Sequence, residues 1–404
     1  MIFNRPRSDL ALLLLAIVLG ALLGVWRPNL ALEMKPLSDL FISVIGLCAP
    51  VVMFVLVCSA TAALSDYRAT ARLGLKAAGY WQLMSLLSLS IGLAVALLLH
   101  PGEGLEDASQ AWSAPALGSQ GPLLARVPSL LLDVLEHSPI LKVLLAALLA
   151  GLLLGRSGEA GRRLARQLER AMVLVFRAMR LIVAFAPLAA FGAIAFIIGK
   201  YGLDAAIPLA KFVVAAYAAC LAYLLLVPLL VMRLIGCRLH KLVGYIKEEL
   251  LLVMSTGSSV AALPRLVEKL EAAGCDSQTV RLTLTAGYSF NLNGSGLYLV
   301  VAVVFLAQLN HVQLDPPLLA SILLVCLLTS LGSTSVAGSA FVTLAATLSV
   351  LHIVPLESIG LLIGVERLMK CRSLTNVLGN CVACLVLACW HGKVDRDKLR
   401  AVLG

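Results

Sequence analysis

The amino-acid sequence predicts an all-α, polytopic membrane protein with eight transmembrane helices and two re-entrant helical hairpins. The first observation is composition: the 404 residues are 60% hydrophobic and only 13% charged, whereas soluble domains carry about a quarter charged residues. The second is the presence of eight apolar runs, each long enough to cross about 30 Å of hydrocarbon. The third is a pair of apolar stretches interrupted by small hydroxylated residues, which predicts hairpins that enter the membrane and return.

Six of the predicted spans come first along the chain. They cover residues 10–26, 40–64, 77–99, 129–155, 181–199 and 205–236. The first run follows Arg5 and Arg7, as in a signal peptide, but it is long for a signal core and no clear cleavage site follows, so we interpret it as a span. Basic residues crowd the second, fourth and sixth connections and the C-terminal tail. The positive-inside rule therefore predicts cytoplasmic N- and C-termini.

After Lys247 the pattern changes to an ordered repeat. A stretch with small residues at Ser255–Ser259 precedes a span with an Asn and Gly break at Asn291–Gly294, and a second such stretch at Ser330–Ser339 precedes a span with a break at Asn376–Asn380. One full crossing separates the copies, which predicts inverted repeats whose hairpin tips and breaks converge on one site. Close helix packing explains one such cluster well. It explains four ordered clusters poorly.

The last apolar segment, Val365–Trp390, carries an arginine where a plain span has leucine. A charge inside the membrane costs at least ~2.5 kcal/mol, so it usually faces a cavity, a partner or a ligand. Helical spacing places Arg372, Asn376 and Asn380 on one face. We interpret this face as a binding surface for an anion. The alternative is that Arg372 snorkels to a helix end or pairs with Glu366.

Several of these motifs resemble one transporter family. The segment Ala286–Gln308 (AGYSFNLNGSGLYLVVAVVFLAQ), the hairpin tips and the final span resemble the dicarboxylate/amino acid:cation symporter family. The segments EELLLVMSTGSSVAALPRLVEKLEAAGC, GYSFNL, LAATLS and LTNVLGN are most similar to the branch that carries four-carbon dicarboxylates such as succinate, fumarate and malate. The resemblance extends from about Met34 to Trp390.

This resemblance implies an elevator-type carrier, usually a homotrimer, in the inner membrane of a bacterium. Residues 1–247 would form mainly the scaffold and trimerisation region, with the third span associated with the moving part. Residues 248–390 would form the transport core and residues 391–404 a cytoplasmic tail. The expected partners are a small dicarboxylate, membrane lipid and further copies of the chain.

The resemblance also implies a substrate site. Arg372 would hold one carboxylate, because a guanidinium fork matches two carboxylate oxygens. Asn376 and Ser295 would complete the pocket. The two hairpin tips would offer backbone amides to the other carboxylate, with the second hairpin as outer gate. The tip residues concerned are Gly257, Ser258, Ser259, Val336, Ala337 and Gly338.

One position favours a substrate without an amino group. The amino acid carriers of the family have an aspartate one turn before the arginine, where it binds the substrate's ammonium, and this chain has Met369. An ammonium there would lack a compensating charge. The chain is also one residue shorter than the family between Met369 and Arg372, which changes the position of Lys370 relative to Arg372. Lys370 could add a second positive charge to the pocket.

Cation coupling stays open at the sequence level. Sodium prefers oxygen ligands with compensating charge, but Asn293 and Asn380 stand where the wider family has aspartates, and Gln82, Leu86 and Val260 replace other polar or acidic residues. Glu366, His352 and Lys370 are the candidates for proton coupling. Sodium, proton and uncoupled exchange all remain possible. The expected cation-binding positions are Gly287, Ser289, Asn291, Asn293, Asn376, Asn380, Ser330 and Ser333.

Two classes of function remain. The first is a secondary transporter for four-carbon dicarboxylates. The second is a dicarboxylate-binding sensor derived from such a carrier, which has lost its ion sites. An enzyme is not expected, because no Ser/His/Asp set, metal cluster or phosphate loop occurs at usable spacing. The ten cysteines are spaced neither as a disulfide framework nor as a zinc site. Membrane topology explains the excess of Lys and Arg over Asp and Glu better than nucleic-acid binding does. No resident cofactor is expected.

Overall fold

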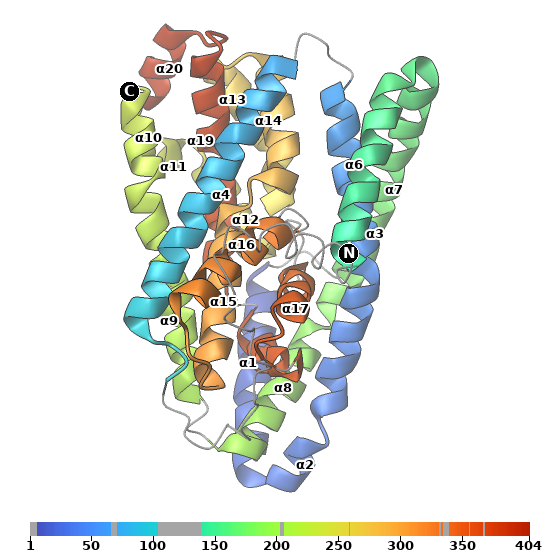
Figure 1. Cartoon of the computed structure of the whole chain (residues 1–404), viewed down its shortest axis with the longest axis vertical. Helices are drawn as coiled ribbons and strands as arrows, with labels where there is room; N and C mark the ends of the chain where they lie inside the picture. Colours follow the sequence, from blue (N-terminus) through green and yellow to red (C-terminus); the bar gives the residue numbers. More distant parts are fainter. Residues whose placement is uncertain are drawn as a thin grey trace.

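The computed structural model is helical over nearly all the residues that it describes (Figure 1). Extended pairing in this part of the chain is limited to an isolated antiparallel bridge between Cys275 and Val394. The described residues are 6–65, 71–103, 139–202, 206–257, 259–330, 333, 339–354, 356–366 and 368–404.

Four helical runs in the described part are long and apolar enough to cross a membrane. They are Leu73–Leu99, Ile207–Leu234, Ser277–Leu309 and Lys370–Trp390. Shorter apolar helices include Leu15–Trp26, Leu145–Arg156, Pro187–Lys200 and Pro316–Ser330. The predicted class, an all-helical polytopic membrane protein, agrees with this architecture. The number of eight spans stays a prediction.

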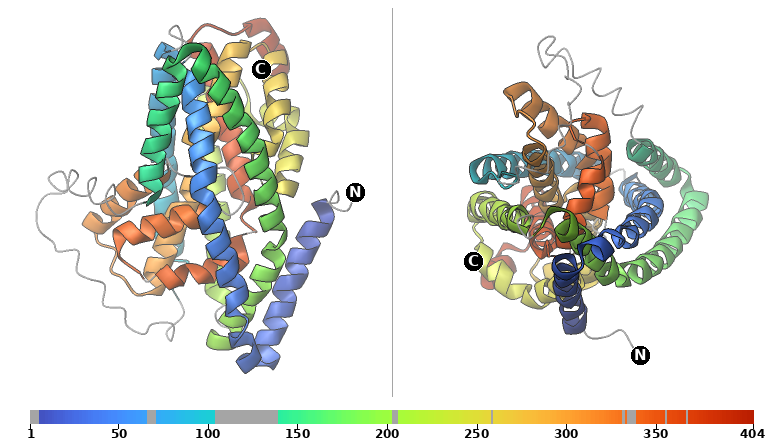
Figure 2. Two further views of the ribbon diagram at one scale, coloured as in Figure 1. Left: turned by 90° about the vertical axis from the view of Figure 1, so that its right-hand side faces the viewer. Right: turned by 90° about the horizontal axis from the view of Figure 1, so that it is seen from below.

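The N-terminal helices pack mainly on one another. Helix α1 lies against α8, and α3 lies against α6, α7 and α8. In Figure 2 they form an arc on one side of the molecule. The start of the predicted span 129–155 falls outside the described residues. The bounds are α1 (Pro6–Trp26), α2 (Pro28–Leu32), α3 (Lys35–Ser65), α6 (Pro139–Arg156), α7 (Gly158–Ala184) and α8 (Ala186–Tyr201).

Helix α7 contains the arginine-rich connection that was predicted between the fourth and fifth spans. These residues form a helix of 27 residues. Arginine, leucine, alanine, glutamate and glutamine are all good helix formers, so a polar segment of this composition is helical without being a span. Arg163, Arg170 and Arg177 lie at intervals of seven residues and are all exposed.

A second group of helices surrounds the C-terminal half. Helices α4 (Ala71–Leu99) and α9 (Ala206–Leu226) both pack against α15 and α19. Pro228 begins α10 (Pro228–Leu234) directly after α9, as suits a residue with no N–H to donate. The short helices α11 (Leu239–Tyr245) and α20 (Arg396–Leu403) pack together at the end that holds the C-terminus (Figure 1).

The first predicted hairpin is present. It consists of α12 (Lys247–Thr256), a 3₁₀ turn at Ser259–Ala262 and α13 (Leu263–Ala272). Gly257 ends α12 at φ +69°, a conformation that favours glycine. Lys269 of α13 joins the two arms, because its Nζ lies 2.7 Å from the buried carboxylate of Glu249 and also donates to the Tyr245 carbonyl.

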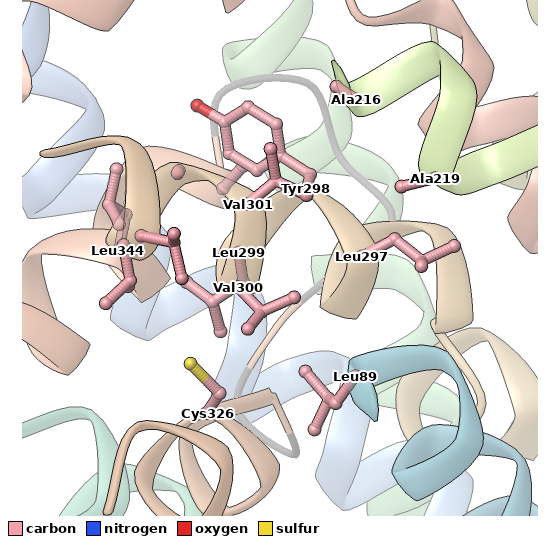
Figure 3. Close-up of a cluster of buried hydrophobic side chains, with 14 of the residues drawn as sticks. Leu89, Ala216, Ala219, Leu297, Tyr298, Leu299, Val300, Val301, Cys326 and Leu344 are labelled. Atoms are coloured by element: carbon pink, nitrogen blue, oxygen red, sulfur yellow. The ribbon is translucent and has the colours of Figure 1, made fainter. Parts of the chain in front are cut away.

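The span after this hairpin is interrupted where the sequence predicts. Helix α14 (Ser277–Phe290) ends before Asn291, and α15 (Asn293–Leu309) begins two residues later. Every residue of α15 is buried. Its side chains Leu297 to Val301 contact α4 and α9 on one side and the second hairpin on the other (Figure 3). The break is therefore enclosed by protein, as irregular backbone at membrane depth requires.

The second hairpin is formed by α16 (Pro316–Ser330) and α17 (Ser339–Leu351). The hydroxyls of Thr329 and Thr347 lie 2.8 Å apart and connect its arms. In Figure 1, α13 of the first hairpin lies toward the end of the molecule that holds the C-terminus, whereas α17 of the second hairpin lies below the middle, toward the opposite end. The two hairpins are thus on different sides of the core.

The predicted break at Asn376–Asn380 is wrong. Helix α19 is continuous from Lys370 to Trp390, and the interruption falls earlier, between Glu366 at the end of α18 (Gly360–Glu366) and Lys370. The polar residues inside α19 are buried and several of them bond to the neighbouring broken span. The asparagines that were expected to disrupt α19 therefore make hydrogen bonds to residues outside this helix.

Candidate functional site

Asn376 joins α19 to the start of α15. Its Oδ1 accepts hydrogen bonds from the backbone N–H groups of Gly294 at 2.8 Å and Ser295 at 3.3 Å, and its Nδ2 donates to Ser295 Oγ at 3.1 Å. Leu292, the residue before α15, supplies no side-chain cap. Asn376 therefore takes the place of an N-cap and satisfies two backbone donors of the broken span.

Glycine is required at position 294 because the two helices approach closely there. A Cβ atom on Gly294 would overlap the carbonyl oxygen of Arg372 and lie 2.9 Å from Thr375 Cβ. A backbone carbonyl inside a helix cannot move aside. The close approach brings Arg372, Asn376 and Ser295, three residues of the substrate site that the resemblance implies, into one region.

Arg372 is buried, with only 7% of its surface exposed. Its Nη2 donates to Glu366 Oε1 at 3.1 Å, and its guanidinium carbon lies 5.5 Å from the centre of the Tyr298 ring. Its Nη1 has no hydrogen-bond partner among the described residues. The structure has features of both interpretations of Arg372. The ion pair with Glu366 is present, and Nη1, the other terminal nitrogen, is left to bind an anion.

The first hairpin tip lies against the start of α19. Ser373 Oγ donates to the Gly257 carbonyl at 3.0 Å, and a Cβ atom on Gly257 would lie 2.8 Å from Lys370 Nζ. The N–H of Gly257 already donates to Val253 within α12, whereas the buried Ser259 hydroxyl has no partner in the described part. Ser258 lies outside the described residues.

The second hairpin forms a small pocket with α15. Four hairpin residues and three α15 residues line it, so predicted residues from both motifs meet there. The predicted tip residues Val336, Ala337 and Gly338 lie outside the described residues. The lining residues are Ser295, Tyr298, Leu299, Ser330, Ser333, Ala340 and Thr343.

Three of the candidate cation-binding residues, Asn291, Asn293 and Asn380, form a chain of neutral amides. Asn293 Nδ2 donates to Asn291 Oδ1 at 2.9 Å, and Asn291 Nδ2 donates to Asn380 Oδ1 at 3.0 Å. Gly287 packs directly against the Asn380 amide, with no room for a Cβ atom. Ser289 belongs to α14, and its side chain lies outside the described set. The described residues contain no group of three or more His, Cys, Asp or Glu that could hold a metal.

The remaining candidates lie on other elements. Gln82 and Leu86 are exposed on α4, and Val260 lies in the 3₁₀ turn of the first hairpin. His352 is exposed at the end of α17. Sequence reasoning missed Tyr298, which stacks near Arg372. Its position three residues after Ser295, on the same helix face, was a usable signal.

Residues 10–390 match the family described as the sodium:dicarboxylate symporter family. Over 399 residues, 96% of this chain and 93% of the relative, the chain is 40% identical to the C4-dicarboxylate transport protein of Burkholderia pseudomallei strain 668. The C4-dicarboxylate transport protein of Burkholderia mallei strain SAVP1 is equally similar over the same length. The resemblance of the hairpins and the final span is thereby confirmed. The chain belongs to the sodium:dicarboxylate symporter family.

Proposed function

We propose that the protein is a secondary transporter of four-carbon dicarboxylates of the succinate, fumarate and malate type. The observation that carries the proposal is Arg372, a buried cation with an unused Nη1 beside the junction of α15, α19 and the first hairpin. A carboxylate is the natural acceptor for that nitrogen. The 40% identity to C4-dicarboxylate transport proteins supports the same substrate class.

The surrounding groups favour a dianion. Ser295 and Asn376 offer polar groups to one carboxylate of the substrate. Lys370 of α19, whose Nζ lies beside Gly257 of the first hairpin tip, adds a positive charge for the second carboxylate. Met369, at the start of α19, offers no negative charge to a substrate ammonium. An amino acid would leave its ammonium uncompensated in this buried setting.

The transport movement we propose is of the elevator type in a homotrimer. Helices α1, α3, α6, α7 and α8 pack mainly on one another and would form the scaffold. The moving part would include the hairpins, α14, α15, α18 and α19. We add both α4 and α9 to it because each packs against α15 and α19, although the sequence suggested only the third span. The second hairpin would act as the outer gate.

We place the protein in the inner membrane of a bacterium with both termini in the cytoplasm. The basic residues Lys393, Arg396, Lys398 and Arg400 near the C-terminus support this orientation under the positive-inside rule. Figure 1 places the turn between α6 and α7, which is also rich in arginine, at the same end of the molecule as the C-terminus.

A dicarboxylate-binding sensor is the second candidate. The amide chain of Asn291, Asn293 and Asn380 favours it, because neutral amides compensate a bound cation less well than carboxylates. A sensor would keep the anion site and lose accumulation. The two functions therefore differ in transport and not in binding.

Uptake of labelled succinate into liposomes tests the proposal. The purified protein is assayed with a sodium gradient, a proton gradient or neither. Accumulation above the external concentration would establish a coupled transporter, and equilibration an uncoupled one. Arg372→Ala should abolish uptake and binding, whereas Arg281→Ala, which removes an exposed arginine of α14, should change neither. Tight binding without uptake would favour the sensor, and no binding would refute the substrate class.

A further inference from the structure

Two acidic side chains are buried among the described residues, Glu249 and Glu366, with 1% and 6% of their surfaces exposed. Glu249 belongs to the first hairpin, where Lys269 compensates it at 2.7 Å. Glu366 ends α18 and faces Arg372 at 3.1 Å. Glu366 is therefore the buried acid that contacts the arginine on which the proposed function rests.

Substrate binding changes the charge at this arginine. In the empty site the charges of Glu366 and Arg372 cancel, and a dicarboxylate then introduces two negative charges. The substrate carboxylate and an ionised Glu366 would share one guanidinium in a buried place, where like charges repel strongly. A proton on Glu366 removes one of these charges. With Lys370 nearby, two cations would then face the two carboxylates of the substrate.

The positions expected to bind sodium give no comparable compensation. Asn293 and Asn380 are neutral, and the amide groups of Asn291 and Asn293 donate into oxygens that a cation would need. A sodium ion bound there would keep its full positive charge, because these residues include no carboxylate to compensate it. The coupling charge is more readily supplied as a proton at Glu366.

Several elements contribute titratable or charged groups around Glu366. Arg372 makes the ion pair, and Tyr298 of α15 lies within electrostatic range of both partners. The elements that pack on α18 are α3, α8, α9 and the 3₁₀ turn Leu356–Ile359. Besides Arg372, the described titratable or charged side chains on α19 and on the packed helices are Lys370, Cys371, Cys381, Cys384, Cys389, Lys200, Lys211, Tyr217, Cys220, Tyr223, Lys35, Asp39 and Cys58.

We propose that Glu366 is the site of the coupling proton and that it competes with the substrate for Arg372. A proton from the outer solution binds the Glu366 carboxylate, the ion pair opens, and a substrate carboxylate takes the guanidinium. After the core has moved, substrate leaves, the proton is released to the cytoplasm and the pair with Arg372 forms again. Proton and substrate thus favour each other's binding. This inference rests on the proposed function.

Fumarate binding to the purified protein as a function of pH tests the inference. Fumarate stays a dianion between about pH 6 and about pH 8, so its own titration does not interfere. Because the inference requires one proton to bind with each fumarate, the Kd should rise about tenfold per pH unit. Glu366→Gln should bind with a Kd independent of pH and more tightly than wild type at about pH 8. Glu249→Gln, the matched buried acid, should keep the wild-type pH dependence.

Proton uptake on binding supplies a second measurement that needs no variant. In weakly buffered potassium solution, wild type should take up about one proton per fumarate bound at about pH 8. In liposomes, an inward proton gradient should drive accumulation by wild type, whereas Glu366→Gln should exchange fumarate without accumulating it.

The outcomes separate the inference from the proposed function. Wild-type binding that Arg372→Ala abolishes would support the substrate site whatever Glu366 does. A Glu366→Gln variant with the wild-type pH dependence, or fumarate binding without proton uptake, would overturn the role of Glu366 and leave that site standing. If the variant fails to fold, the proton uptake of wild type decides. Absence of fumarate binding by wild type would overturn both.

Discussion

Asn376 of α19 holds Ser295 of α15 by two hydrogen bonds, one from the Ser295 N–H to Oδ1 at 3.3 Å and one from Nδ2 to Ser295 Oγ at 3.1 Å. The two residues are 81 positions apart in the sequence. Their contact fixes the start of α15 against the first third of α19. The anion site depends on this contact, because Arg372 lies one turn before Asn376 on the same helix.

Two substitutions of Asn376 should separate its structural role from its role in binding. Asn376→Ala leaves the N–H groups of Gly294 and Ser295 without an acceptor, which should cost about 1–3 kcal/mol and also weaken dicarboxylate binding. Asn376→Asp keeps an acceptor at the positive end of α15, so most of the stability should remain. Its negative charge should still abolish binding. Thermal unfolding in detergent and a binding isotherm measure the two effects; binding by Asn376→Asp at wild-type affinity would contradict the assignment.

A pair of glycines in α15 offers a matched test of helix approach. Gly294→Ala should lower the melting temperature and abolish binding, because its Cβ atom would overlap the Arg372 carbonyl oxygen. Gly296→Ala, two residues later, should be tolerated, since its Cβ atom would meet Leu89 and Ser88 side chains at 3.5 Å, an ordinary contact distance. Equal behaviour of the two variants in thermal unfolding would show that the close approach at Gly294 is not a constraint.

Asn293→Asp should create a dependence on sodium. The variant places a buried carboxylate among the amides of Asn291 and Asn380, which should cost several kcal/mol unless a cation neutralises it. Sodium chloride should therefore raise the melting temperature of Asn293→Asp more than potassium chloride does, whereas wild type should respond equally to both salts. A wild-type protein that is itself stabilised by sodium would contradict the interpretation of Asn293 as a lost ligand.

Removing one partner of the ion pair between Lys269 and Glu249 in the first hairpin should strongly destabilise the protein. Lys269→Met leaves Glu249 buried without its paired cation, which should destabilise the protein by about 3–5 kcal/mol. The double variant Lys269→Met with Glu249→Gln should recover part of this loss, because no charge remains buried. Unfolding in mixed micelles measures both. A double variant less stable than Lys269→Met would show that the charge of Glu249 is compensated by another group.

The sequence predicted the parts of the structure that depend on local pattern. Helical periodicity placed Arg372, Asn376 and Asn380 on one face, and α19 is helical through all three. The small residues around Gly257 predicted the first hairpin, and Asn291 predicted the break between α14 and α15. These features follow from spacing and backbone preference within a few residues, which a single sequence contains.

The tertiary structure alone decided which polar groups meet. The break in the last span lies before Lys370 and not at Asn376–Asn380. Asn376 bonds to the start of α15, and the Oδ1 of Asn380 accepts a hydrogen bond from Asn291 between α14 and α15, so neither asparagine opens its own helix. Arg372 and Glu366 meet across that break, where helical spacing does not predict a distance. Composition and periodicity determined the fold class and the candidate site residues. The packing of helices that are far apart in the chain determined the hydrogen-bond partners of those residues, because a buried polar group bonds to whichever group the fold brings within reach.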